Sequence, residues 1–112
     1  MNLSDLEPHE RLAFAGLVRA MIRMDGEVTP DEAHAVTKIA NAVGAQQFWA
    51  AMKTAQECLA SPAEVSKAAE QVTRPEVRAW ALGELRKLAD SDGLDISEDA
   101  LLRWLARAWE LA

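Results

Sequence analysis

Apolar residues recur at helical spacing along almost the whole chain. Between Arg11 and Met24 only three arginines interrupt an apolar run, and they lie four or eight positions apart, on one stripe of a helix. A helix with one thin polar stripe is mostly buried, so we expect this segment to form the centre of a bundle. No segment shows the strict alternation of apolar and polar residues that is typical of a strand.

Capping residues and glycines divide the chain into six predicted helices. The first has Pro8 near its start and ends at Asp25-Gly26, and Ser97 is expected to cap the last. Three segments combine Ser or Thr with Pro and Glu in a way that is typical of a helix start, at residues 29–32, 61–64 and 73–76. The four middle helices are therefore predicted over residues 30–43, 45–59, 62–72 and 75–92.

Two stretches of the chain, residues 17–43 and 82–109, share one layout. Each contains a helix that ends in Asp-Gly, then a branched apolar residue (Val28 or Ile96), a Ser or Thr, acidic residues and a second helix. The second copy carries one extra residue before Ile96. We therefore predict an all-α fold, a compact bundle of six to seven helices built from two helical hairpins about a pseudo-twofold axis. Residues 1–112 are expected to form a single domain.

Acidic residues gather at both turns. An acid lies seven positions after the Asp of each Asp-Gly pair: Glu32 follows Asp25, and Asp99 follows Asp92. Carboxylate oxygens suit hard cations such as calcium or magnesium. The spacing matches the second half of an EF-hand loop, but the first half is missing, so a true EF-hand is not predicted. The competing interpretation is that these acids favour the positive ends of helices and stay solvated.

The repeated string Asp-Gly-x-Val-Thr/Ser-x-x-Glu after a helix resembles the TerB-like (tellurite-resistance) family, whose domains also occur in some membrane-associated DnaJ-type co-chaperones. The resemblance extends over about residues 12–111. It implies a compact helical bundle, no enzymatic role and a divalent metal near the turns. By motif match the ligands would be Asp25, Glu32 and Asp92. The second copy departs from the pattern, because Ala100 stands where the helix-start Glu is expected and Asp99 substitutes from the neighbouring position.

Charge and cysteine content narrow the choice of partners. The formal net charge is -6, which repels phosphate backbones and anionic lipid, so we expect no nucleic-acid partner and no direct membrane insertion. The single cysteine, Cys58, cannot form an internal disulfide, and no signal peptide or membrane-spanning run is evident, which favours the cytoplasm. Because Cys58 lies among Ala and Leu, we expect it to be buried.

Four tryptophans contribute a large apolar surface for a chain of 112 residues. Trp104 and Trp109 are five positions apart in the last helix, so they point to different sides of it. We predict that Trp104 lies at an edge and contributes to a surface for a protein partner. The alternative is that Trp104 makes a second core contact.

Catalytic motifs are missing from the sequence: there is no evident nucleophile–base pair, phosphate-binding glycine loop or zinc motif. We therefore predict a non-enzymatic, stress-associated TerB-like binding module. Its acidic turns are expected to bind a divalent cation, whether calcium, magnesium, manganese or zinc. The alternative is a metal-free protein-interaction module that docks a partner through an apolar groove between its halves. The oligomeric state is left open.

Overall fold

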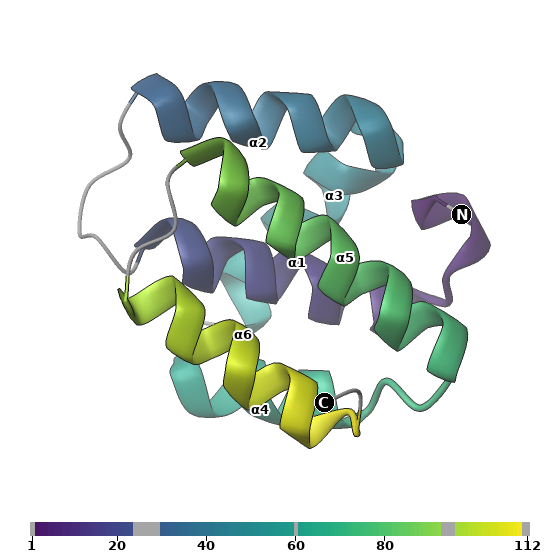
Figure 1. Ribbon diagram of the computed structural model, residues 1–112. Helices are drawn as coiled ribbons and strands as arrows, with labels where there is room; N and C mark the ends of the chain where they lie inside the picture. The colour runs from purple at the N-terminus through teal and green to yellow at the C-terminus, as the bar shows by residue number, and fades with distance from the viewer. Residues whose placement is uncertain (1, 24–29, 60, 93–95, 111–112) are drawn as a thin grey trace.

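The computed structural model describes residues 2–23, 30–59, 61–92 and 96–110, and within these ranges it is entirely helical (Figure 1). A short 3-10 helix, η1, precedes six α-helices, which confirms the predicted all-α bundle of six to seven helices. The elements are η1 Leu3–Asp5, α1 Pro8–Arg23, α2 Pro30–Val43, α3 Ala45–Cys58, α4 Pro62–Glu70, α5 Pro75–Asp92 and α6 Ile96–Ala108.

Proline marks four of the helix starts. The four prolines of the chain are the first residues of α1, α2, α4 and α5. This position suits proline because its fixed φ matches the helix and its missing N–H would have no partner there. At α4 the predicted cap is confirmed, since the Ser61 hydroxyl oxygen accepts a hydrogen bond from the Glu64 amide at 3.3 Å.

Two of the predicted caps are wrong. At the start of α5 the N-cap position belongs to Arg74 and not to Thr73, because the Arg74 carbonyl accepts the first helical hydrogen bonds, from the amides of Val77 and Arg78. At α6 the helix already begins at Ile96, so Ser97 lies inside it. Arg74 is a poor capping residue, and its side chain serves a different contact that local sequence rules do not reveal.

Helix α1 lies at the centre of the bundle, as its thin polar stripe predicts. It packs against α3, α4 and α5, and every residue from Ala13 to Val18 is buried. The principal partner of α2 is α5, the first helix of the second repeat, and α6 packs on the other side of α5 (Figure 1). The two repeats, residues 17–43 and 82–109, are therefore joined through contacts between α5 and both α1 and α2.

Aromatic rings link three helices in the core. The Phe14 ring of α1 lies edge-on to Phe48 of α3, with centroids 6.4 Å apart, and 5.2 Å from the Trp80 ring of α5. At the end of α6 the buried Trp109 indole donates a hydrogen bond from Nε1 to the Ala69 carbonyl at 2.9 Å. Each buried ring of this size removes a large apolar area from water and so favours folding.

Glu10 is the one buried charged residue in the described part of the chain, with 2% of its surface exposed. Its carboxylate accepts two hydrogen bonds from Arg74, at 2.9 Å from Nε and 2.6 Å from Nη2, and one from the Glu7 amide at 2.8 Å. Arg74 Nη2 also donates to the Asp5 carbonyl at 3.2 Å. The bidentate geometry ties the start of α1 to the segment between α4 and α5.

The hydrogen bonds from Arg74 hold the pKa of the Glu10 carboxyl below its ordinary value of 4.5, against the opposing effect of burial. A carboxylate with a lowered folded-state pKa stabilises the protein above its unfolded pKa, and this stabilisation is lost as the pH falls through the folded value. Glu10 therefore contributes to the stability of the fold near neutral pH and contributes less in acid.

We expect the substitution Glu10→Gln to lower the free energy of unfolding at neutral pH by about 1 kcal/mol, because a charge-assisted pair is lost while the partly exposed Arg74 can still be solvated. Below about pH 4.5, the free energy of unfolding of the variant should fall less steeply than that of the unsubstituted protein, because the substituted side chain has no carboxylate to protonate. Urea unfolding across this pH range measures both effects. Glu57→Gln, at an exposed acid of α3, is the control, and equal effects of the two substitutions would contradict the assignment.

Two glycines give opposite predictions for substitution by alanine. Gly44 joins α2 to α3 with φ of 113°, where a side chain is strained, so Gly44→Ala should lower the free energy of unfolding by about 1–2 kcal/mol. Gly83 lies inside α5, and an added Cβ would meet no described atom within 4 Å beyond the backbone of its own helix. Gly83→Ala should therefore raise the free energy of unfolding by about 0.5–1 kcal/mol. Denaturant unfolding of the two variants tests this, and shifts of the same sign would contradict it.

Candidate functional site

The predicted metal ligands fall at the junctions between helices. Asp25 lies outside the described residues, and the side chains of Glu32, Asp92 and Asp99 are likewise outside the described part. Their backbone positions are defined: Glu32 is in the first turn of α2, Asp92 is the last residue of α5, and Asp99 is in the first turn of α6. The metal site therefore stays a prediction.

The helix ends that flank the two Asp-Gly turns lie at the same end of the bundle. In Figure 1 the end of α1, the start of α2, the end of α5 and the start of α6 all lie on the left side of the molecule. The backbone of three of the four predicted ligands is thus at one end of the fold. Elsewhere, the described side chains include no group of three or more His, Cys, Asp or Glu residues that could hold a metal ion.

The histidines and the cysteine stand on separate elements. His9 is in α1, where Nδ1 lies 3.5 Å from the Glu7 carboxylate, and His34 is exposed on α2. Cys58 is also exposed, at the last position of α3, so its predicted burial is wrong. The reason is rotation about the helix axis: Leu59, the next residue, turns towards the core and leaves the thiol outside.

The tryptophans divide into buried and exposed pairs. Trp109 is 2% exposed and Trp104 is 37% exposed, which confirms that Trp104 lies at an edge of the last helix. Trp80 is partly buried against the core. Trp49 on α3 is 49% exposed, and our sequence reasoning missed it. The sequence could have predicted this exposure, because Trp49 directly follows Phe48 and therefore points about 100° away from the helix face that Phe48 buries.

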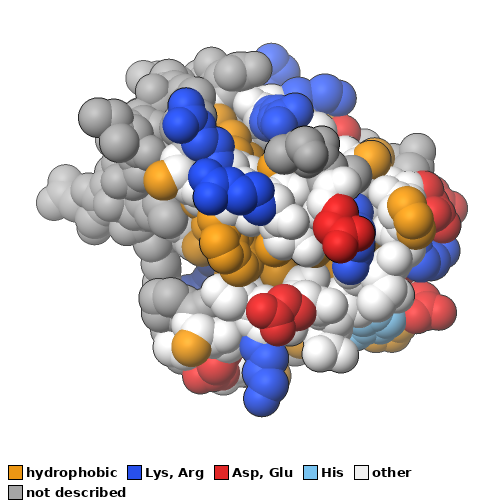
Figure 2. Space-filling model, turned by 60° about the horizontal axis from the view of Figure 1, so that its bottom comes forward, with side chains coloured by type: hydrophobic (Ala, Val, Ile, Leu, Met, Phe, Trp, Pro, Cys, Tyr) orange, Lys and Arg blue, Asp and Glu red, His pale blue; other side chains and the backbone are white. Residues whose placement is uncertain are grey.

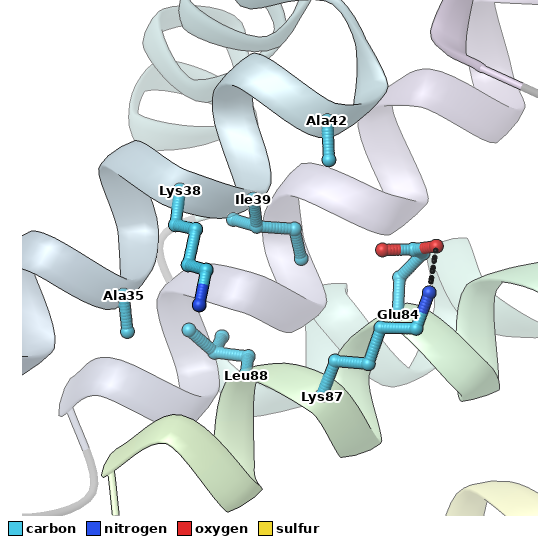
Figure 3. Close-up of a pocket in the computed structure, with 7 residues that line it drawn as sticks. All are labelled: Ala35, Lys38, Ile39, Ala42, Glu84, Lys87 and Leu88. Carbon is cyan, nitrogen blue, oxygen red and sulfur yellow. Dashed lines mark hydrogen bonds and ion pairs between the residues drawn. The ribbon is translucent and has the colours of Figure 1, made fainter.

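An apolar groove lies between α2 and α5, the helices that join the two halves (Figure 3). It has a volume of about 330 Å³, and its lining residues are Ala35, Lys38, Ile39, Ala42, Glu84, Lys87 and Leu88. At one side the Lys87 ammonium lies 3.3 Å from the Glu84 carboxylate. The groove provides an aliphatic floor with charged groups at its rim.

A wider hollow lies between the start of α1 and α3. Its volume is about 600 Å³, and it is lined by both polar and apolar residues, including His9, Arg11, Gln46 and Thr54. The Arg11 guanidinium Nε donates to the carbonyls of Leu3 and Leu6, at 2.8 and 3.2 Å, so this side chain anchors η1. A structural role thus accounts for the first arginine of the polar stripe of α1.

Comparison with known proteins gives one match. A family model described as tellurite resistance protein TerB matches residues 11–112. No curated protein and no solved structure matches the chain significantly. Among the described helices, none is long and apolar enough to cross a membrane. The matched range includes both Asp-Gly turns and nearly all of the helical bundle.

The tryptophan exposures predict the quenching of fluorescence by acrylamide. Trp49→Phe and Trp104→Phe should each reduce the fraction of emission that the quencher reaches, because these indoles contact solvent. Trp109→Phe should leave that fraction nearly unchanged, since Trp109 is buried and hydrogen-bonded to the Ala69 carbonyl. Quenching titrations of the three variants provide the measurement. Uniform shielding of all emission would contradict the assignment.

Proposed function

The chain belongs to the TerB tellurite-resistance family, and from this premise we propose that it is a non-catalytic binding module that holds a divalent cation at its two acidic Asp-Gly turns. The observation that carries the proposal is that the helix ends flanking the two turns lie at one end of the bundle (Figure 1). Residues from the two repeats are therefore candidates for one shared site or for two neighbouring sites.

The proposed ligands are the carboxylates of Asp25, Glu32, Asp92 and Asp99. An all-oxygen donor set favours calcium, magnesium or manganese, while zinc prefers nitrogen and sulfur ligands and is the weaker candidate. The starts of α2 and α6 carry partial positive charge, which stabilises ionised acids in their first turns. A bound cation would relieve the repulsion among these like charges.

Catalysis is not part of the proposal. The exposed Cys58 thiol is on α3, while the two histidines are on α1 and α2, so neither histidine shares a helix with the thiol. A single exposed thiol fits a reducing compartment such as the cytoplasm. A role in stress follows from the description of the family and is proposed on that basis.

A second candidate function is metal-free docking of a protein partner in the groove between α2 and α5. The observation that favours it is the aliphatic lining of this groove by side chains from both halves of the chain (Figure 3). Docking there should persist in chelator and should be lost when Ala42→Trp, at an exposed position of the lining, fills the groove.

Thermal unfolding of metal-stripped protein tests the cation proposal. Calcium, magnesium or manganese should raise the Tm, because a ligand that binds only the native state adds about 2.7 kcal/mol of stability at a concentration of 100 Kd. Asp25→Asn and Asp92→Asn should each reduce this rise. Glu57→Gln, which removes an exposed acid on α3, is the matched control. The absence of any shift, or an equal loss in the control, would refute the proposal.

A further inference from the structure

The solvent-facing side of α6 carries a basic and aromatic stripe. Five exposed residues recur at intervals of three and four positions, and we call them the α6 outer face: Ala100, Arg103, Trp104, Arg107 and Ala108. The segment from Ala100 to Trp109 contains no acid, although the chain as a whole has 18 acids against 12 Lys and Arg. This face therefore differs in charge from the rest of a strongly acidic molecule.

The core fixes the outward direction of this face. On the opposite side of α6, Leu102, Leu105 and Trp109 are buried. The Trp109 indole is hydrogen-bonded to the Ala69 carbonyl at 2.9 Å, and Arg78 Nη1 donates to the Trp109 carbonyl at 3.5 Å. With these contacts in place α6 cannot rotate, so Trp104 cannot turn inward. The exposure of its indole is a consequence of the packing and not of a loose helix end.

On the α6 outer face, the charge of Arg107 is available for a partner. Within the described part of the chain, Arg107 forms no ion pair. The next acid along the chain, Glu110, lies beyond the end of α6, where the backbone has turned to φ of 59°. Figure 2 brings the side of α4 and α6 forward and shows Lys and Arg side chains lying beside exposed hydrophobic ones.

We propose that the α6 outer face docks an acidic amphipathic segment of a partner protein. A carboxylate of that segment pairs with Arg107, and an apolar side chain covers the Trp104 indole between the two alanines. Arginine and tryptophan are the residue types most often found at the energetic centre of protein interfaces. This inference rests on the proposed role as a binding module, but it involves neither the metal nor the groove between α2 and α5.

Charge favours an acidic protein segment over the other partners that this face could contact. A second copy docked symmetrically through the same face would bring arginine against arginine, which is unfavourable. An extended polyanion, such as nucleic acid or an anionic membrane, would be repelled by the rest of a molecule whose net charge is -6. A short acidic segment stays within about one Debye length, near 10 Å, of the arginines and avoids most of that repulsion.

A dye-labelled synthetic helix of Glu and Leu, with Leu at every third or fourth position, serves as the probe in fluorescence anisotropy. We expect it to bind the full chain in the presence of chelator, and to bind more weakly as salt is raised. Arg107→Glu and Trp104→Ala should each weaken binding by about tenfold. The matched controls on α3 are Lys53→Glu and Trp49→Ala, which make the corresponding changes of charge and ring at another exposed tryptophan and basic residue and should have little effect.

Four results would overturn this proposal. They are failure of the probe to bind, equal binding of a probe with Gln in place of Glu, equal losses in the α3 controls, and preferential binding of phosphatidylglycerol vesicles or duplex DNA. Circular dichroism and urea unfolding of each variant separate lost binding from lost folding. Because the titration is done in chelator, its outcome is independent of the thermal-shift test of the cation site, and either proposal can fail alone.

Discussion

The ion pair between Glu10 and Arg74 holds together parts of the chain that are 64 positions apart. Helix α1 contacts α3, α4 and α5, so an interaction that fixes the start of α1 also fixes the frame on which these helices pack. A buried carboxylate is tolerated only when it is paired and its remaining lone pairs are used. Arg74 and the Glu7 amide meet this condition, and Arg74 extends the connection to η1 through the Asp5 carbonyl.

From this frame the packing decides which surfaces remain for binding. Helix α5 separates α2 from α6, and each of these outer helices buries one side against it. The tryptophan at the end of α6 is locked onto α4, which leaves Trp104 and Arg107 facing solvent. The same arrangement brings the end of α1, the start of α2, the end of α5 and the start of α6 to one end of the bundle. The α6 outer face thus forms a basic, aromatic side of the molecule.

The positions of several described ionisable groups bear on the proposed binding role. Glu10 and Arg11 make contacts that stabilise the fold, whereas His34 and Cys58 are exposed on different helices. The proposed cation ligands and the proposed docking residues of α6 are different residues of the chain. Membership of the TerB family is consistent with such a role and does not itself specify a partner.

The sequence by itself determined the helices, because periodicity, proline at the first position and Asp-Gly stops act over a few residues. It correctly identified α1 as central and Trp104 as exposed. The metal ligands were predicted from the repeat and remain a prediction. Only the tertiary structure revealed that Arg74 replaces Thr73 at the α5 cap and that Cys58 faces solvent. These outcomes depend on contacts between distant segments and on the rotation of each helix against its neighbours, which local patterns do not encode.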